Sequence, residues 1–331
     1  MMLIAGILLA LALPAARDPG GLIPDGRAAP AGHSSQSVPQ TRPTTLTSLW
    51  RDTPADPSRV RIDPIPGVTE PSDLLLRGGS LYTISDSYRR IYQLGLAGPG
   101  GGVRLEASWE PRGLPEETDL EALAELPGGE VLLASETNGT IFVVHPFPTH
   151  VCAAWQTGIQ GTCLIGRANC GIEAMAILPG PRLFVAKERD PRAAYLFDLP
   201  ERPCAGATVK GRTSLRLPEE VGPDISAATW DAASGHLLLV ARTNQRVLEF
   251  EVVEPAARVV DAPPPSLVLV GSFSFAATED RLDYVGLRFP RVEGIAVDAG
   301  RVLYLAIDNN EELSRRFGDR RAALLRFFPG G

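Results

Sequence analysis

The sequence predicts an all-β fold, a single β-propeller of five four-stranded blades. Short apolar hairpins recur five times at intervals of roughly 50 to 70 residues, and such recurrence is typical of repeat architectures. The composition suits many strands joined by turns, because 33 of the 331 residues are Gly and 30 are Pro. No long segment shows the periodicity of an amphipathic helix.

Each repeat begins with a hairpin that opens on an acidic or polar residue. The five hairpins are expected at residues 72–86, 119–136, 171–188, 224–243 and 292–308. Third strands are expected at residues 90–96, 140–146, 193–199, 246–252 and 322–328. Fourth strands are expected at residues 103–109, 153–159, 210–217 and 266–273. Four antiparallel strands in each repeat form the blade of a β-propeller.

The two ends of the propeller are expected to share one blade. The last repeat ends at Gly331 before a fourth strand, whereas segment 59–63 precedes the first hairpin without a repeat of its own. This early strand is expected to complete the last blade, because unpaired sheet edges are prone to aggregation. A six-bladed alternative would require another blade within residues 253–291.

The residues before position 58 are expected to lie outside the propeller. Residues 1–16 form an apolar run with the length of a signal peptide, and an uncleaved anchor is the alternative. Residues 17–57 are rich in Pro, Ser and Thr, which predicts a flexible tether. The propeller domain is expected to span 58–331. We therefore expect a secreted or periplasmic protein with no other membrane contact.

The four cysteines predict two disulfides, as is usual for an even number in an exported protein. Three connectivities exist, and we favour Cys152 with Cys163 and Cys170 with Cys204. A metal site is the alternative, but no CxxC motif occurs and no His lies among these residues.

The negative charge of the chain argues against a polyanionic partner held by overall electrostatic attraction. The formal net charge is −7, and Lys187 and Lys210 are the only lysines. We therefore expect no nucleic-acid partner. Separately, we expect a monomer.

Acidic residues open and close four of the five hairpins. The opening and closing pairs are Asp73 with Asp86, Glu121 with Glu136, Glu173 with Glu188, and Glu293 with Asp308. The midpoint of every pair falls on turn residues, so the two acids are expected to be approximate cross-strand neighbours. The first strand of a blade lines the central channel, so all eight carboxylates are expected at one end of it. The fourth hairpin has the neutral residues Ser226 and Thr243 instead.

Clustered carboxylates require a counter-charge, because like charges that face one another repel. Oxygen ligands without His or Cys favour Ca²⁺, so these eight acids are candidate metal ligands. Nearby arginines are a second source of counter-charge, and a wet channel with solvated acids is a third interpretation.

The phrases ETDLEALAELPGGEVLLASE, NCGIEAMAILPGPRLFVAKE and RVEGIAVDAGRVLYLAIDNN resemble the phytase-like propeller family, also known as the esterase-like activity of phytase family. The resemblance covers roughly residues 70 to 328. It implies a β-propeller, an exported location and Ca²⁺-dependent hydrolysis of a phosphoester or carboxylester. Among the acids that match the family motif, we take Glu121, Glu173 and Glu293 as the candidate catalytic residues. The candidate substrate-binding residues are Lys187, Arg189, Arg242 and Arg291.

Two functions follow from these observations. The first is a Ca²⁺-dependent hydrolase that acts on a small anionic or ester substrate at the acidic end of the channel. The second is a non-catalytic propeller that binds a protein or glycan at the same face. Fold does not distinguish them, and the chain lacks the GxSxG motif of a serine hydrolase.

Overall fold

A computed structural model of the protein describes residues 59–97, 101–159, 170–189, 191–206, 208–254, 263–276, 291–308 and 322–329. The chain divides into two compact units, Met1–Arg42 and Pro43–Gly331, and all described residues belong to the second. The predicted leader and the whole of the predicted tether therefore lie outside the described residues.

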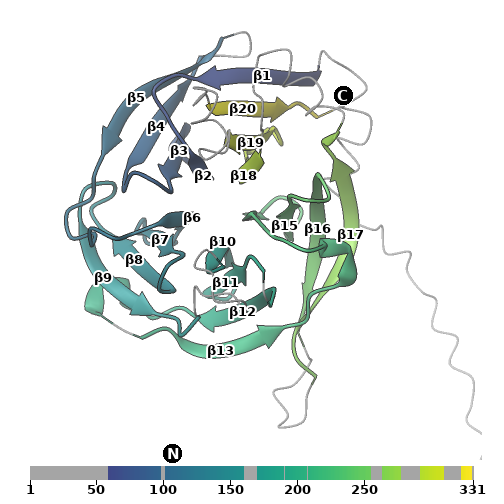
Figure 1. Ribbon diagram of the computed structural model, residues 1–331. Coiled ribbons are helices and arrows are strands. Elements are labelled where there is room, and N and C mark those ends of the chain that lie inside the picture. Colours follow the sequence, from purple (N-terminus) through teal and green to yellow (C-terminus); the bar gives the residue numbers. More distant parts are fainter. Residues whose placement is uncertain are drawn as a thin grey trace, which may run out of the picture. The chain divides into compact units, whose positions relative to one another are not determined.

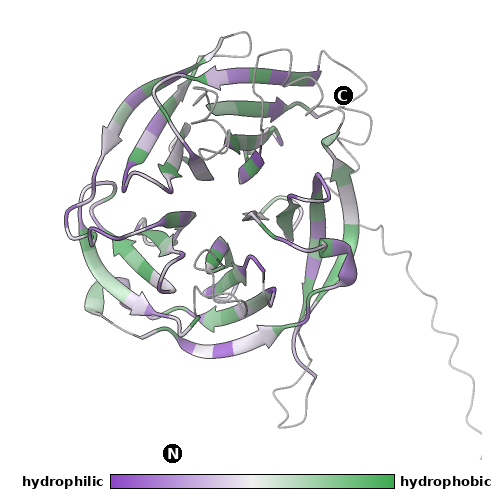
Figure 2. Ribbon diagram, in the orientation of Figure 1, coloured by the Kyte–Doolittle hydropathy of each residue, from purple (hydrophilic) through white to green (hydrophobic). Residues whose placement is uncertain are grey.

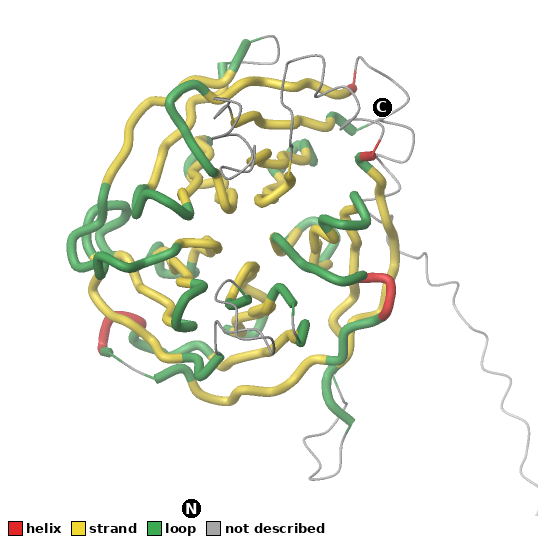
Figure 3. Tube along the Cα trace, viewed as in Figure 1, coloured by secondary structure: helices red, strands yellow, loops and turns green. Residues whose placement is uncertain are grey.

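The described residues form five four-stranded antiparallel sheets around a common centre, which confirms the five-bladed propeller (Figures 1 and 3). Blade 1 contains β2 (Pro71–Arg77), β3 (Ser80–Ser85), β4 (Ile91–Leu96) and β5 (Val103–Trp109). Blade 2 contains β6 (Leu120–Glu125), β7 (Val131–Ser135), β8 (Thr140–Val144) and β9 (Val151–Gln156). Blade 3 contains β10 (Ile172–Leu178), β11 (Arg182–Lys187), β12 (Ala193–Asp198) and β13 (Lys210–Leu215). Blade 4 contains β14 (Ala227–Asp231), β15 (His236–Ala241), β16 (Arg246–Val253) and β17 (Ser266–Ser274).

Blade 5 joins the two ends of the propeller, as predicted. It contains β18 (Arg291–Val297), β19 (Leu303–Asp308), β20 (Ala322–Phe327) and, as its outer strand, β1 (Val60–Ile65). A buried ion pair reinforces this closure, because Arg326 of β20 contacts the Asp63 carboxylate of β1 at 2.6 and 2.8 Å. Two short 3₁₀ helices, η3 (Pro203–Ala205) and η4 (Glu219–Val221), lie in connections.

Five hydrophobic clusters form the core, and each is shared by two adjacent blades. Between blades 4 and 5, for example, Phe273 and Phe327 meet edge to face with ring centroids 5.0 Å apart. Each blade therefore buries its apolar surface against both neighbours, which fixes the position of the inner strands. Figure 2 shows hydrophobic residues throughout the blades and hydrophilic residues on the inner strands near the centre.

The inner hairpins depart from the register that the acidic pairs predicted. Asp73 faces Ile84 rather than Asp86, and the register shifts just before it, between Pro71 and Asp73. Similar shifts flank Glu121, Glu173 and Glu293. A β-bulge places one extra residue on the inner strand. The midpoint between two acids therefore does not show which residues face each other across the hairpin.

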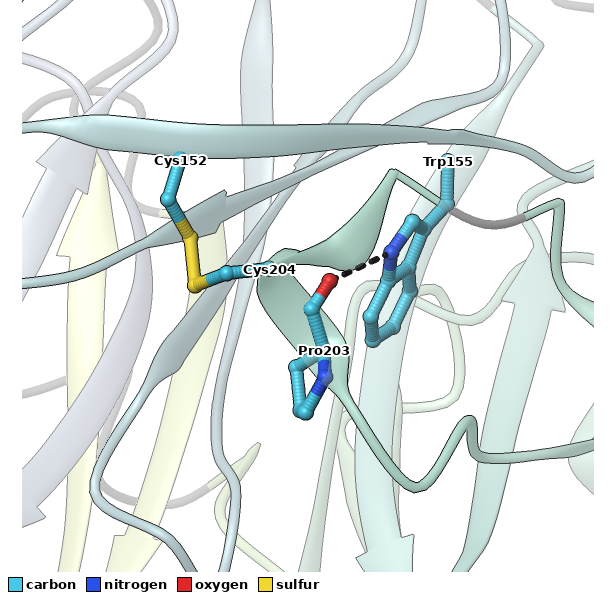
Figure 4. The surroundings of a disulfide bond; sticks show 4 residues. All are labelled: Cys152, Trp155, Pro203 and Cys204. Atoms are coloured by element: carbon cyan, nitrogen blue, oxygen red, sulfur yellow. Dashed lines mark hydrogen bonds between the residues drawn. A yellow bond between two sulfur atoms is a disulfide. The ribbon is translucent and has the colours of Figure 1, made fainter.

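One disulfide joins blade 2 to the connection that follows β12 in blade 3 (Figure 4). Cys152 of β9 pairs with Cys204 of η3, and the nearby Trp155 indole N–H donates to the Pro203 carbonyl at 3.1 Å. Cys170 is also disulfide-bonded, whereas Cys163 lies outside the described residues. Our predicted pairing is therefore wrong, because the chain staples two neighbouring blades rather than closing a short local loop.

Candidate functional site

The bulges and strand ends of the inner hairpins bring ionisable side chains to one end of the propeller. The bulged residues Glu121, Glu173 and Glu293 begin the inner strands of blades 2, 3 and 5. A bulge re-aims the side chain of its extra residue, and all three line a common cavity of about 170 Å³. We call this the acidic cavity.

Twelve residues from all five blades or their connections line the acidic cavity. They are Pro71, Ser72, Asp86, Asp119, Glu121, Glu173, Glu188, Arg189, Arg242, Arg291, Glu293 and Asp308. Seven carboxyl groups therefore face three guanidinium groups, a formal excess of four negative charges. The predicted gathering of acids from separate blades at one end of the propeller is thus observed.

Most predicted site residues lie at this cavity, but their roles are not determined by their position. Six of the eight candidate ligands line it, and Glu136 contributes a carboxylate oxygen within 4.8 Å of those of Asp119 and Glu121. Arg189, Arg242 and Arg291 also line it. Lys187, the last residue of β11, does not line it.

Asp73 is the candidate ligand that points away from the cavity. In blade 1 the bulged residue is Ser72, so the neighbouring Asp73 turns into the junction between blades. Its carboxylate accepts the backbone N–H groups of Leu74 at 2.8 Å, Leu123 at 2.7 Å and Ile295. Asp73 thus ties the inner strands of blades 1, 2 and 5 together, which is a structural role.

Blade 4 supplies an arginine where the other blades supply an acid. Arg242 follows β15 directly, as Glu136 follows β7 and Glu188 follows β11. Its guanidinium contacts Glu188 of blade 3, Glu293 of blade 5 and Asp224 of its own blade. Sequence reasoning placed Thr243 at this position, one residue too late. The alignment of Ala-Arg-Thr-Asn (241–244) with Ser-Glu-Thr-Asn (135–138) would have revealed the substitution.

Two further acids at this end were missed from the sequence. Asp119 lines the cavity from the residue before β6, and its carboxyl group hydrogen bonds to that of Glu121. Asp224 precedes β14 and accepts the Thr243 N–H at 3.0 Å and its hydroxyl at 2.9 Å. Both residues precede the opening position of their hairpin, so a search for a single opening acid passed over them.

A glycine allows the acids of blades 2 and 3 to approach one another. A Cβ atom at Gly171 would lie 2.0 Å from the Glu136 carbonyl oxygen, so no other residue fits there. The Gly171 N–H donates to the Glu136 carboxylate at 3.1 Å, and the Glu136 and Glu173 side chains hydrogen bond to each other. A hydrogen bond between two carboxyl groups requires that they share a proton.

Burial and mutual repulsion raise the pKa values of acids on the side of the cavity formed by blades 1 to 3. Burial and then repulsion by Asp308 and Asp119 raise the pKa of Asp86 to about 7. Burial chiefly raises the pKa of Glu136, also to about 7. Burial and then the charge of Glu173 raise the pKa of Glu121 well above its usual range. These groups therefore favour a proton or a cation.

The opposite side of the cavity already has its counter-charge. Burial opposes the ionised form of Arg242, but the carboxylates of Glu293, Glu173, Glu188 and Asp224 hold its pKa above the ordinary value. Although burial opposes ionisation of Asp224, hydrogen bonds from Thr243 and the charge of Arg242 hold its pKa below the usual range.

Two overlapping groups of three acids have the spacing of a cation site. Carboxylate oxygens of Asp119, Glu121 and Glu136 lie within 4.8 Å of one another, and so do those of Glu136, Glu173 and Glu188. Two oxygens bound to one Ca²⁺ at 2.3 to 2.6 Å are separated by no more than roughly 5 Å. The residues therefore fit a hard cation in distance and in ligand type.

The channel has a different character at its other end. A second cavity of about 230 Å³ is lined mainly by apolar residues such as Leu76, Met175, Ile177 and Val297, with Glu125 among them. The concentration of carboxyl groups is thus specific to the end where the inner strands begin.

The similarity to solved structures is found at low sequence identity. The glutaminyl cyclase of Myxococcus xanthus is 15% identical, with 82% of this chain and 96% of that chain covered and a TM-score of 0.52. A luciferin-regenerating enzyme is 11% identical, with the same coverage and a TM-score of 0.49. At 15% identity the similarity to the glutaminyl cyclase concerns the fold alone.

Family membership follows from the sequence. None of the curated proteins shows significant similarity to this chain. The model of the SdiA-regulated family, a β-propeller-type family, matches residues 75–261, which is more than half of the chain. The match begins within β2 of blade 1 and includes the inner hairpins of blades 2 to 4, with Glu121, Glu173 and Arg242 of the acidic cavity. The chain therefore belongs to the SdiA-regulated family.

Proposed function

We propose that this propeller is a Ca²⁺-dependent hydrolase that acts on a small phosphoester at the acidic cavity. The observation that carries the proposal is the presence of two groups of three carboxylates at cation-binding distance beside three arginines. The resemblance to phytase-like propellers supports the same chemistry.

Calcium fits the ligands better than zinc or copper does. Every candidate ligand is a carboxylate oxygen, and no His or Cys belongs to either group. Hard oxygen ligands favour Ca²⁺, which accepts six to eight of them in loose geometry. A bound Ca²⁺ would polarise a phosphoryl oxygen and lower the pKa of water.

The arginines favour a phosphoester over a neutral carboxylester. Guanidinium groups present a planar fork that matches phosphate oxygens. Arg242 is held by three carboxylates, so Arg189 and Arg291 are the better candidates for direct contact with the substrate. They would orient the phosphate and offset its charge.

Glu121 is the best candidate for the general base. Glu293 is paired with Arg242, and the positive charge of Arg242 also acts on Glu173, so both are weaker bases than Glu121. Glu121 lines the cavity, and no ion pair joins it to a basic residue of the described chain. A positioned base contributes roughly 10²- to 10⁴-fold to a rate.

The test compares two glutamates of the same strand. Glu121→Gln should reduce the calcium-dependent hydrolysis of p-nitrophenyl phosphate at least about 100-fold. Glu125→Gln changes the other end of β6, in the apolar cavity, and should leave the rate within about twofold. Equal rates in the Glu121 variant and the wild type, with calcium still required, would refute the role of Glu121.

A non-catalytic binding propeller is the second candidate. The acidic cavity of about 170 Å³ is smaller than most small-molecule sites, which span roughly 300 to 1,000 Å³. A cavity of this size suits an ion and its waters that stiffen the ring beneath a protein or glycan ligand. Calcium binding without turnover of p-nitrophenyl phosphate or p-nitrophenyl acetate would favour this function.

We also propose that the protein is exported from the cytoplasm. The Cys152–Cys204 disulfide fits an extracellular protein, because such bonds persist in oxidising compartments. The described part of the chain contains no helix with the length and hydropathy that a membrane crossing requires. Detection of the mature protein in the periplasmic or culture fraction would test it.

A further inference from the structure

The five blades place one ionisable residue each after, or at the end of, the second strand of the inner hairpin. These residues are Asp86, Glu136, Glu188, Arg242 and Asp308. All but Glu136 line the acidic cavity, and Glu136 lies within ligand distance of residues that do. The ring therefore has four acidic positions and one basic position.

The guanidinium of Arg242 reaches into the acidic groups on both sides of blade 4. It contacts Glu188 of the preceding blade and Glu293 of the following blade, while Asp224 holds its Nε atom at 3.3 Å. Only 14% of the side chain is exposed, so solvent does not screen these contacts strongly. Arg242 thus provides a fixed positive charge where a second cation would otherwise reside.

The two candidate cation groups differ in their relation to Arg242. The group of Glu136, Glu173 and Glu188 includes a direct partner of the guanidinium. The group of Asp119, Glu121 and Glu136 includes none, and no arginine or lysine of the described chain forms an ion pair with it. Because Glu136 belongs to both groups, a cation bound by one group weakens cation binding by the other.

We propose that Arg242 is an internal counter-charge that restricts the acidic cavity to one divalent cation, held by Asp119, Glu121 and Glu136. This inference rests on the proposed cation binding but not on catalysis. It makes Arg242 a positioning residue, since it acts by occupying Glu188 rather than by contact with the ion. It also assigns the ion to the side of blade 2, away from Arg242.

The test is the calcium stoichiometry, measured by titration calorimetry with calcium chloride at pH 8. The wild type should bind one Ca²⁺. Arg242→Gln should bind two, because the buried charge that neutralises Glu188 and Glu293 is lost and only the more exposed Arg189 still pairs with Glu188. Arg242→Lys retains the charge and should bind one. Arg189→Gln is the matched control, because Arg189 also pairs with Glu188 but is 42% exposed, and it should bind one.

A second pair of variants locates the ion without changing Arg242. Glu121→Gln should lower the affinity for the single Ca²⁺ at least about tenfold, since calcium affinity follows the number of charged ligands. Glu188→Gln should change the affinity less than about threefold. Circular dichroism and thermal unfolding establish that each variant is folded.

The outcomes separate the inference from the proposed function. A stoichiometry of one in a folded Arg242→Gln, or loss of the ion from Glu188→Gln but not from Glu121→Gln, would overturn the inference while calcium binding stands. A wild type that binds no calcium would overturn the proposed function together with the inference.

Discussion

The metal-free protein should become less stable as the pH rises from 5 to 8. Asp86 and Glu136 have pKa values of about 7 in the folded protein, against 3.8 and 4.5 as ordinary values. Between these limits the folded state holds protons that the unfolded chain has released. The stabilisation is therefore complete below pH 4 and is lost as the pH passes through 7.

The expected loss is large compared with the stability of a typical domain. A shift of one pKa unit corresponds to about 1.4 kcal/mol, so each group contributes on the order of 2 to 3 kcal/mol between pH 5 and pH 8. The two together give roughly 5 kcal/mol. The raised pKa values of Glu121 and Glu173 act in the same direction. Asp224 has a lowered pKa, so its contribution changes only at more acidic pH.

Urea unfolding in the presence of a chelator measures this loss directly. The free energy of unfolding should be several kcal/mol lower at pH 8 than at pH 5, and calcium should restore it at pH 8. Glu136→Gln removes one titrating group and should reduce the difference by about 2 to 3 kcal/mol. A free energy of unfolding that is equal or higher at pH 8 in the metal-free protein would refute the reasoning.

Three other changes test the supports of the ring. Arg326→Met should lower the free energy of unfolding by about 3 kcal/mol in a urea titration, because it leaves Asp63 buried without this partner; no change would mean that β1 closure does not depend on the pair. Cys204→Ser removes the disulfide to Cys152, which closes a loop of 52 residues, and should lower the free energy of unfolding by up to about 4 kcal/mol. An unchanged melting temperature would contradict this. Asp73→Asn places an amide N–H₂ against backbone N–H donors and should lower the free energy of unfolding by about 1 to 3 kcal/mol in chemical denaturation. An unchanged free energy of unfolding would show that Asp73 does not hold the blades together.

The fold was largely predictable from the sequence because its signals are repeated. Five hairpins with turn residues at their centres fixed the number of blades, and the unmatched segment 59–63 predicted the closure by β1. Single strands were less certain. The fourth strand of blade 2 was expected at 153–159 and lies at Val151–Gln156, because its short apolar sequence carries no sharp boundary signal.

The candidate site was predictable in its location but not in its detail. The acids of different blades were expected at one end of the propeller, and all but Asp73 are there. Bulges shift the register by one or two residues, and a one-residue shift sends a side chain to the other face of the sheet. For this reason Asp73 was assigned to the cavity. Thr243 was examined in place of Arg242 because the expected pairing placed the closing position of blade 4 one residue too late.

The pairing of the cysteines could not be deduced from their spacing. Cys152 and Cys204 are separated by 52 residues and belong to different blades, but the packing of those blades leaves their Cα atoms 5.2 Å apart. Sequence separation alone favours nearby partners, whereas the contact between β9 and η3 is a product of the folded ring.

The central claim is that acids from separate blades together hold a hard cation. A crystal structure of the protein grown with calcium chloride at pH 8 tests it most directly. We predict one strong electron-density peak with oxygen ligands at roughly 2.3 to 2.6 Å from Asp119, Glu121 and Glu136. Water alone in the acidic cavity at saturating calcium would contradict the claim.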